Sequence, residues 1–403
     1  MPTKKTKKKK KGSRRVVEKA QRFDKESATA VYYGFTPRDV KLLDRERLAK
    51  IKKALELDPK KDSPIFQEFD AGINLDEKLT LLNEIIENDI NLSQPMMVYF
   101  RKKTSDKSIN CGFEAIGTGK SISEATLIKV ALEILKQEGY DKTHLEINSL
   151  GDRESLARLT RELTAYYRKH INDLPAPCRQ LLKRDVFEVL LYPHEKCILL
   201  RDDAPKPMNY LSELSREHFR EVLEFLERMD IPYQIISSLV GNRKYTSHVV
   251  FEIKKGEPGS ENAEVLARGI RYNGMAKKLG SRKDIPAVGV ALSFKPLSTV
   301  RESATFMKKP KLYYIQLGFE AKLKSLKVIE LLRQQKIPVQ QSLSKDKLTS
   351  QLATADHLKI PFVLIMGQKE AMEDSIIVRT ISNRSQETIK IEALPDYIRK
   401  LTS

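Results

Sequence analysis

The chain has 403 residues, of which 40% are hydrophobic and 32% are charged, a composition typical of a globular protein with two or three domains. No apolar run approaches the roughly 20 residues that a membrane-spanning helix requires, and no apolar segment follows the amino-terminal lysines as it would in a secretory signal. The three cysteines have no paired spacing, so neither a disulfide framework nor a zinc site is expected. These features favour a protein of the reducing cytoplasm with no membrane partner and no metal.

The formal net charge of +19 favours association with a polyanion such as nucleic acid. Nine basic residues and no acidic one lie between Met1 and Arg15. We therefore predict that residues 1–22 form a disordered basic arm that contacts RNA phosphates without reading sequence. Its candidate RNA-binding residues are Lys7, Lys8, Lys9, Lys10, Lys11, Arg14 and Arg15. A mobile tail that only aids solubility is the alternative interpretation.

Apolar residues at helical spacing predict helices over residues 45–57 and 75–90. Two β-prone runs with a short polar connection predict an antiparallel hairpin. Its strands are residues 97–100 and 109–116. The elements predicted next are a helix at 123–138, a strand at 144–149, a helix at 153–169, a mostly helical region at 178–233, and strands at 233–240, 247–253 and 287–294.

Residues 298–309 are polar and basic, and we interpret them as a linker between domains. Beyond them, strands alternate with helices, which predicts a compact α/β module with a largely parallel sheet. The predicted strands are residues 312–317, 339–341, 362–366 and 375–380, and the predicted helices are 321–335 and 347–358.

Several stretches, taken in order, resemble histidyl-tRNA synthetase, a class II aminoacyl-tRNA synthetase. They include Glu146 to Asp152, Ser215 to Phe219, Arg271 to Gly274, and Ala355 to Leu358 running into Val363 to Gly367. The likeness covers roughly Pro95 to Leu401, and the first class II motif is not placed. It implies an α+β fold, with a class II synthetase-like antiparallel sheet and helices in residues 23–300, a helical insertion at about 170–232, and an α/β anticodon-binding-like domain in residues 310–403.

The resemblance implies that arginines of the second and third class II motifs and of a histidine-specific loop neutralise charge on the α-phosphate of ATP. All three positions depart from the family pattern here. The arginine-bearing hairpin of the second motif is shortened, and Arg101 is the nearest arginine. The end of the third motif falls on Ser293 to Pro296. In the histidine-specific loop, the family's arginine falls on Gly241, which leaves Arg243 as the possible substitute.

The resemblance also implies substrate-binding roles for three residues. Glu114 lies where the family has a carboxylate that contacts the amino group of the substrate, Asn110 replaces a neighbouring glutamine, and Tyr245 lies within the histidine-specific loop. A charge on the polar face of a strand is the alternative interpretation of Glu114. In the anticodon-binding-like domain, Lys345 and Lys347 are candidate RNA-binding residues, although helix lysines are often simply solvated.

Three functions remain open from the sequence. The first is a noncatalytic synthetase paralogue that binds tRNA or another RNA. The second is a divergent active histidine–tRNA ligase, a homodimer that uses ATP and magnesium with Arg101 and Arg243 in altered geometry. The third is a histidine-binding regulatory subunit, a group that lacks the anticodon-binding domain which this chain resembles.

Overall fold

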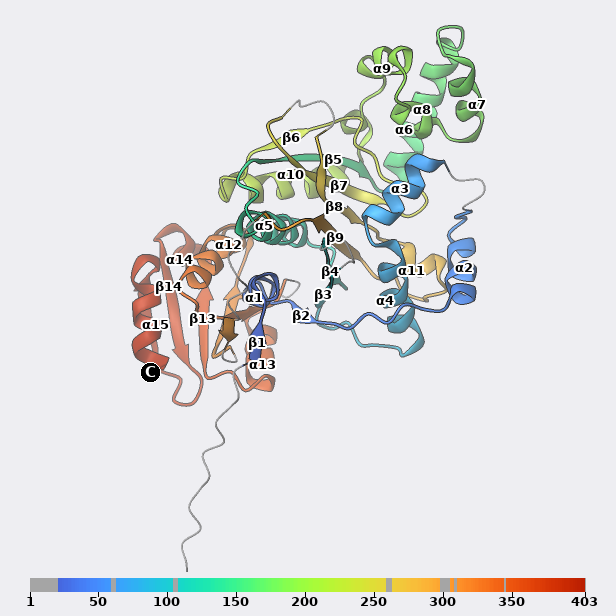
Figure 1. Ribbon diagram of the computed structural model, residues 1–403. Helices are drawn as coiled ribbons and strands as arrows, with labels where there is room; N and C mark the ends of the chain where they lie inside the picture. Colours follow the sequence, from blue (N-terminus) through green and yellow to red (C-terminus); the bar gives the residue numbers. More distant parts are fainter. Residues whose placement is uncertain are drawn as a thin grey trace, which may run out of the picture.

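The computed structural model describes residues 21–58, 63–103, 108–258, 263–297, 305–307, 310–343 and 346–402. A large sheet with helices on both faces forms the centre, and a second sheet domain follows it at the carboxyl end (Figure 1). In these ranges no helix is long and apolar enough to cross a membrane.

The large sheet has eight strands in the order β2-β3-β4-β9-β8-β7-β5-β6. Its six central strands pair antiparallel, and the two short edge strands pair parallel to their neighbours. The strands are β2 (Thr36–Pro37), β3 (Met96–Lys103), β4 (Ile109–Ile116), β5 (Thr143–Gly151), β6 (Tyr233–Ile235), β7 (Ser247–Lys255), β8 (Val265–Arg271) and β9 (Ala287–Phe294). This antiparallel sheet with helices confirms the predicted α+β class.

Helices cover both faces of this sheet because successive side chains of each strand point to opposite faces. Helices α5 (Ile122–Gln137) and α10 (Glu213–Arg228) pack on the face that carries Phe113 and Phe251. The segment of α3 (Pro64–Gly72) and α4 (Leu75–Glu87) covers the face that carries Val98 and Ile270, with α2 (Arg45–Ala54) and α11 (Met275–Lys278) beside it. Helices α3 and α4, together with α2 and α11, therefore cover this face of the sheet. We call the α3–α4 segment the lid.

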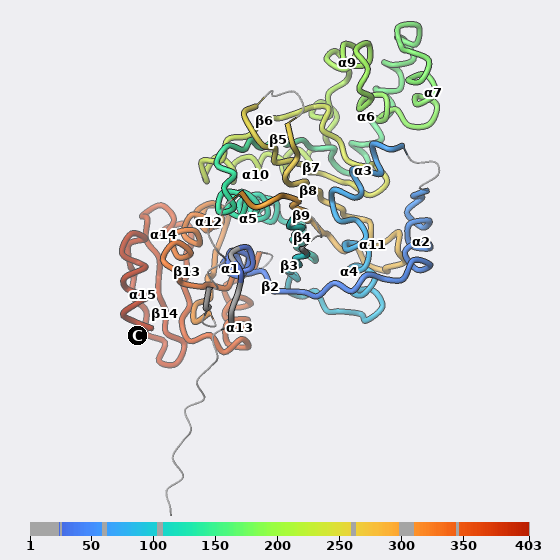
Figure 2. The backbone as a smooth tube through the Cα atoms, in the orientation of Figure 1, coloured from blue at the N-terminus to red at the C-terminus, as the bar shows by residue number. Residues whose placement is uncertain are grey.

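A group of helices between β5 and α10 projects from one end of the sheet (Figure 2). These helices have an apolar cluster of their own. It consists of α6 (Arg153–Lys169), α7 (Ala176–Arg184), α8 (Val186–Leu191), α9 (Glu195–Asp202) and the short helix η1 (Pro207–Tyr210). A disulfide joins Cys178 of α7 to Cys197 of α9. The expectation that no disulfide forms was therefore wrong, because the fold brings together two buried cysteines whose spacing in the sequence gives no pairing signal.

The carboxyl-terminal domain has a five-stranded sheet in the order β12-β11-β13-β14-β15. Only β12 and β13 pair parallel with β11, whereas β13–β14 and β14–β15 are antiparallel, so the expected largely parallel sheet is a mixed one. The elements are β11 (Leu312–Gln316), α12 (Phe319–Gln334), β12 (Val339–Gln341), α13 (Leu348–His357), β13 (Phe362–Met366), α14 (Gln368–Met372), β14 (Ser375–Thr380), β15 (Gln386–Lys390), η2 (Ile391–Ala393) and α15 (Leu394–Thr402).

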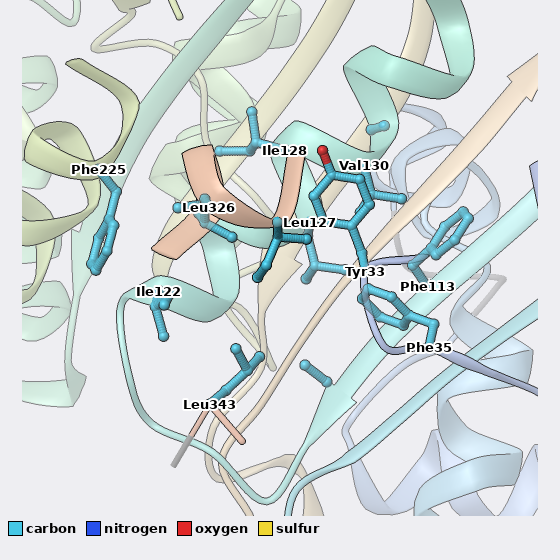
Figure 3. Packing of buried hydrophobic residues seen from close by; sticks show 14 of the residues in the cluster. Tyr33, Phe35, Phe113, Ile122, Leu127, Ile128, Val130, Phe225, Leu326 and Leu343 are labelled. Atoms are coloured by element: carbon cyan, nitrogen blue, oxygen red, sulfur yellow. The ribbon is translucent and has the colours of Figure 1, made fainter. Parts of the chain in front are cut away.

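The amino-terminal segment fastens the two domains together. Strand β1 (Gln21–Phe23) pairs antiparallel with β10 (Thr305–Met307), which lies in the predicted linker. Helix α1 (Lys25–Tyr32) follows, and the Tyr33 hydroxyl donates to Glu330 of α12 at 2.7 Å. Figure 3 shows Leu326 of α12 among Phe225 and Leu127, and all three belong to one buried cluster that crosses the domain boundary.

Several predicted bounds differ from the structure. The strand predicted at residues 97–100 runs on to Lys103, and the helices predicted at residues 45–57 and 75–90 end at Ala54 and Glu87. The strand predicted at residues 233–240 ends at Ile235, because the carbonyls of Ser237 and Leu239 accept from the Asn148 side chain and not from a neighbouring strand. Strand β8 was not predicted, although it pairs with both β7 and β9.

A buried ion pair joins the end of β8 to α5. The Arg271 guanidinium donates to both carboxylate oxygens of Glu124, at 2.5 and 2.6 Å, and to the Thr118 carbonyl at 3.0 Å. Neither charged side chain is exposed to solvent. The pKa of Glu124 lies at about 2: burial acts to raise it, but Arg271 and His218 outweigh that effect.

We predict that Glu124→Gln destabilises the protein by about 3–5 kcal/mol, because it leaves the Arg271 charge buried without a counter-charge. Urea unfolding of the wild type and the variant measures this difference. The matched control is Lys50→Gln, which removes an exposed pair with Glu46 and should change stability by no more than about 0.5 kcal/mol. Similar losses in the two variants would contradict the role given to the buried pair.

Candidate active-site face

Glu114 lies at the centre of the sheet face covered by α3 and α4, and its side chain is completely buried. The Lys78 ammonium of α4 contacts Glu114 Oε1 at 2.5 Å, and the Tyr272 hydroxyl donates to Oε2 at 2.6 Å. On the next strand, Gly289 leaves the room that the carboxylate needs, because a Cβ there would overlap with it. The carboxylate is thus held from both sides by groups of the same chain.

Burial raises the pKa of Glu114, and the Lys78 ammonium and the Tyr272 hydroxyl act against that rise. Lys78 is as completely buried as its partner. Its Nζ also lies 5.4 Å from the centroid of the Tyr272 ring, within cation–π range.

The other two candidate substrate-binding residues also bond to the α3–α4 segment. The Asn110 side chain accepts from Asn74 Nδ2 at 2.8 Å, and the buried Tyr245 hydroxyl donates to the Asp70 carboxylate. Because Asp70, Asn74 and Lys78 are four residues apart, one continuous segment contacts all three candidates.

Arg101 does not lie on the sheet face that carries Glu114. Its guanidinium pairs with Glu26 at 3.0 Å and Asp24 at 3.2 Å, and its side chain is only 13% exposed. Asp24 is also the N-cap of α1, where it accepts from the Ser27 amide. Arg101 therefore anchors the amino-terminal segment to β3.

Arg243 pairs with Asp185 of the projecting helices at 2.6 Å, and 39% of its side chain is exposed. It also lines a cavity of about 600 Å³ along α6, together with Arg153, Arg161 and Arg168. The residues around this cavity include no carboxylate. Arg101 and Arg243 thus lie in separate environments, and the structure does not bring them together.

The end of the third-motif segment supplies no arginine. Phe294 is buried, Pro296 is exposed, and the Lys295 carbonyl accepts from the Tyr140 hydroxyl at 2.9 Å. In the loop before β7, Lys244 Nζ donates to the Glu56 carbonyl at 2.8 Å.

The predicted RNA-binding residues fall into two groups. Lys347 is exposed and is the N-cap residue of α13. The remaining candidates, Lys345 and the seven basic residues of the arm, lie outside the described residues. Within the described ranges, no group of three or more histidine, cysteine, aspartate and glutamate residues is arranged to hold a metal ion.

Comparison with known proteins identifies the family of the chain. Residues 311–401 match the anticodon binding domain family. The apo histidyl-tRNA synthetase of S. aureus has the same fold, with a TM-score of 0.51 at 21% identity over 92% of this chain and 93% of that one. The histidine–tRNA ligase of a Geobacillus species is 27% identical over 80% of each chain. That of Halothermothrix orenii is 30% identical over 72% of this chain and 70% of its own. The chain belongs to the histidine–tRNA ligase family.

Sequence reasoning named Glu114, Asn110 and Tyr245 as candidate substrate-binding residues but missed their partners in the α3–α4 segment. Lys78 left a signal: it lies on the apolar face of α4, in line with Leu75 and Leu82, where an unpaired lysine would be costly to bury. Tyr272 lies inside a stretch that carried the family resemblance, but the direction of its side chain depends on the end of β8, which was not predicted.

This ligase-family fold holds a second polar cluster beside Arg271. The His218 ring lies 2.8 Å from Glu124 and 5.2 Å, between ring centroids, from His248. His248 has a φ of +50°, and its pKa is lowered to about 4 by burial and by the nearby His218 and Arg271 charges, with Glu124 and Asp152 acting in the opposite sense. The neutral form of His248 is therefore the one that fits the fold.

We predict that His248 makes the protein less stable as pH falls from about 6.5 to 4. The unfolded histidine takes up a proton near pH 6.5, whereas the folded one does so only near pH 4. The stabilisation is therefore complete above 6.5 and is lost below it. His248→Asn, which tolerates the positive φ, should reduce the loss of unfolding free energy between pH 7 and 4.5 by about 2 kcal/mol. The exposed His357→Asn is the control. Equal pH slopes in wild type and His248→Asn would rule out this role.

Proposed function

We propose that this member of the histidine–tRNA ligase family is a noncatalytic protein that binds tRNA. The observation that carries the proposal is that all five candidate catalytic and substrate-binding residues already have partners within the chain. Glu114, Asn110 and Tyr245 bond to the α3–α4 segment. Arg101 and Arg243 form ion pairs with carboxylates of other segments.

Activation of an amino acid by ATP requires cationic groups that face the reacting phosphate, and removing one such donor typically costs about 3 kcal/mol of transition-state stabilisation. Here Arg101 and Arg243 are held elsewhere, and Arg268, which lines the cavity beside Asn110, pairs with Glu252 at 2.6 Å. Helices α3 and α4 also cover the sheet face on which Glu114 lies. A substrate would have to displace the Lys78 ammonium before it reached that carboxylate. These features together support the loss of aminoacylation.

The basic surfaces support RNA as the partner. The domain that matches the anticodon binding family exposes Lys347, and four arginines line the α6 cavity, of which Arg243 pairs with Asp185 and Arg161 contacts Glu162. The amino-terminal sequence adds nine positive charges. Lysine and arginine contacts of this kind bind phosphates with little sequence preference, while the anticodon-binding domain makes tRNA the favoured RNA.

An active histidine–tRNA ligase is the second candidate function. The observation in its favour is that the chain spans 80% of a curated ligase from a Geobacillus species. Such an enzyme would need ATP and magnesium, and it would require the α3–α4 segment to leave the Glu114 face. By the family resemblance we also propose a cytoplasmic homodimer for either function.

The direct test of catalysis is histidine-dependent ATP–pyrophosphate exchange by the purified full chain. We expect exchange no faster than in a reaction without histidine, because Arg101 and Arg243 are both paired with carboxylates away from Glu114. A known active ligase in the same buffer is the positive control. Exchange above background would overturn the noncatalytic proposal, and its sensitivity to Arg101→Ala and Arg243→Ala would then show which arginine takes part.

The test of RNA binding is the affinity for tRNA at about 50 and 200 mM salt. We expect binding that weakens with salt, and we expect a variant with the nine basic residues of positions 4–15 changed to glutamine to bind less tightly. The slope of log affinity against log salt should fall by about 3 units or more. The matched control changes Thr3, Thr6 and Ser13 to glutamine and so keeps all nine positive charges. An unchanged slope in the nine-glutamine variant would exclude the arm from the RNA contact.

A further inference from the structure

The surroundings of Glu114 have the composition of a binding site for a primary ammonium ion. A carboxylate contacts the Lys78 nitrogen at 2.5 Å, and an aromatic ring lies 5.4 Å from it. Tyr272 supplies that ring and also donates its hydroxyl to the second carboxylate oxygen at 2.6 Å. Together these groups provide the charge, the cation–π face and the fixed carboxylate orientation that select an ammonium group.

Stability alone does not account for this pair. Replacing a completely buried ion pair with apolar side chains of similar volume is often neutral or stabilising. The pair is also completed by groups from three elements, with the carboxylate on β4, the hydroxyl at the end of β8 and the ammonium on α4. The carboxylate and the hydroxyl belong to the sheet, whereas the cation comes from the segment that covers it.

The covering segment borders a cavity on each side of its middle. A cavity of about 420 Å³ lies beside Asp70, Asn74 and Leu75 on one side. Another of about 520 Å³ lies beside Gly72 and Asn110 on the other. Helix α4 starts between them at Asn74, which has left-handed backbone angles and no side-chain capping bond. Both cavities therefore border the start of α4, whereas Lys78 itself is completely buried.

We propose that Lys78 is an internal ligand of an ammonium-binding pocket, and that a small primary alkylammonium ion takes its place when the lysine side chain is shortened. In the intact chain the lysine keeps the pocket filled, so free amines do not enter. This inference deepens the proposed noncatalytic function. The part that rests on that function is that Lys78 keeps substrate away from Glu114, whereas binding of an ammonium ion in the Lys78→Ala vacancy does not depend on it.

The test is chemical rescue of Lys78→Ala. This substitution removes three carbons and the nitrogen, which are the heavy atoms of n-propylammonium. By ligand-efficiency limits the tightest dissociation constant for so small an ion is on the order of 0.1 mM, and millimolar binding is the reasonable expectation. At 100 mM n-propylammonium chloride, we expect the melting temperature of Lys78→Ala to rise by about 2 °C relative to 100 mM sodium chloride.

Controls separate pocket binding from a general effect of amines. Wild type and Lys78→Ala/Glu114→Gln should show no such rise, because one has no vacancy and the other has no carboxylate. Tetramethylammonium and n-propanol should not rescue Lys78→Ala, since one cannot donate a hydrogen bond and the other carries no charge. If Lys78→Ala does not fold unaided, n-propylammonium but not sodium chloride should allow it to refold from urea.

Equal responses of Lys78→Ala and the double variant, or equal effects of n-propylammonium and tetramethylammonium, would overturn the proposal. So would a failure of n-propylammonium to raise the melting temperature or to support refolding. These outcomes are independent of ATP–pyrophosphate exchange. Rescue together with measurable exchange would refute the noncatalytic function and leave the pocket, whereas no rescue and no exchange would refute only the pocket.

Discussion

Two adjacent residues at the end of β8 hold the layers of the large domain together. Arg271 points to one face of the sheet and pairs with Glu124 of α5, and Tyr272 points to the other and bonds to Glu114, which in turn holds Lys78 of α4. Because successive side chains of an extended chain point to opposite faces, these two neighbouring residues contact the helices on both faces of the sheet. All the charges in these two networks are buried, so each depends on its partners being present.

In this arrangement the stability of the large domain depends on α3 and α4 covering the candidate site. The lid formed by α3 and α4 contributes apolar side chains such as Leu79 and Leu82 to the core, and it also brings Lys78 to Glu114. Opening the face to a substrate would therefore expose apolar surface and separate a buried ion pair in the same step. If α3 and α4 opened and closed to admit a substrate, the free-energy difference between the closed and the open state would have to be smaller than this.

The sequence predicted the elements whose pattern is local. Helix α6 and strands β4 and β9 have the predicted bounds, because α6 carries its buried residues at helical spacing and each strand is a run in which all but one residue is buried. Strands β1 and β10 were missed because each has three residues and pairs with a partner more than 280 positions away. Strand β8 was missed because Gly269 interrupts the β-prone run, where a Cβ would overlap with the Phe251 ring.

The residues of the candidate site could likewise be predicted only in part. Resemblance to a family indicates which positions are candidates for substrate contact, and here the candidates were Glu114, Asn110 and Tyr245. It carries no information about residues 23–93, where no likeness was found, yet Asp70, Asn74 and Lys78 all lie there. A missing arginine shows only that one catalytic group is gone. The partners supplied by this segment bear more directly on function. Glu114 already binds the ammonium group of Lys78, so its presence in the sequence is explained without a substrate.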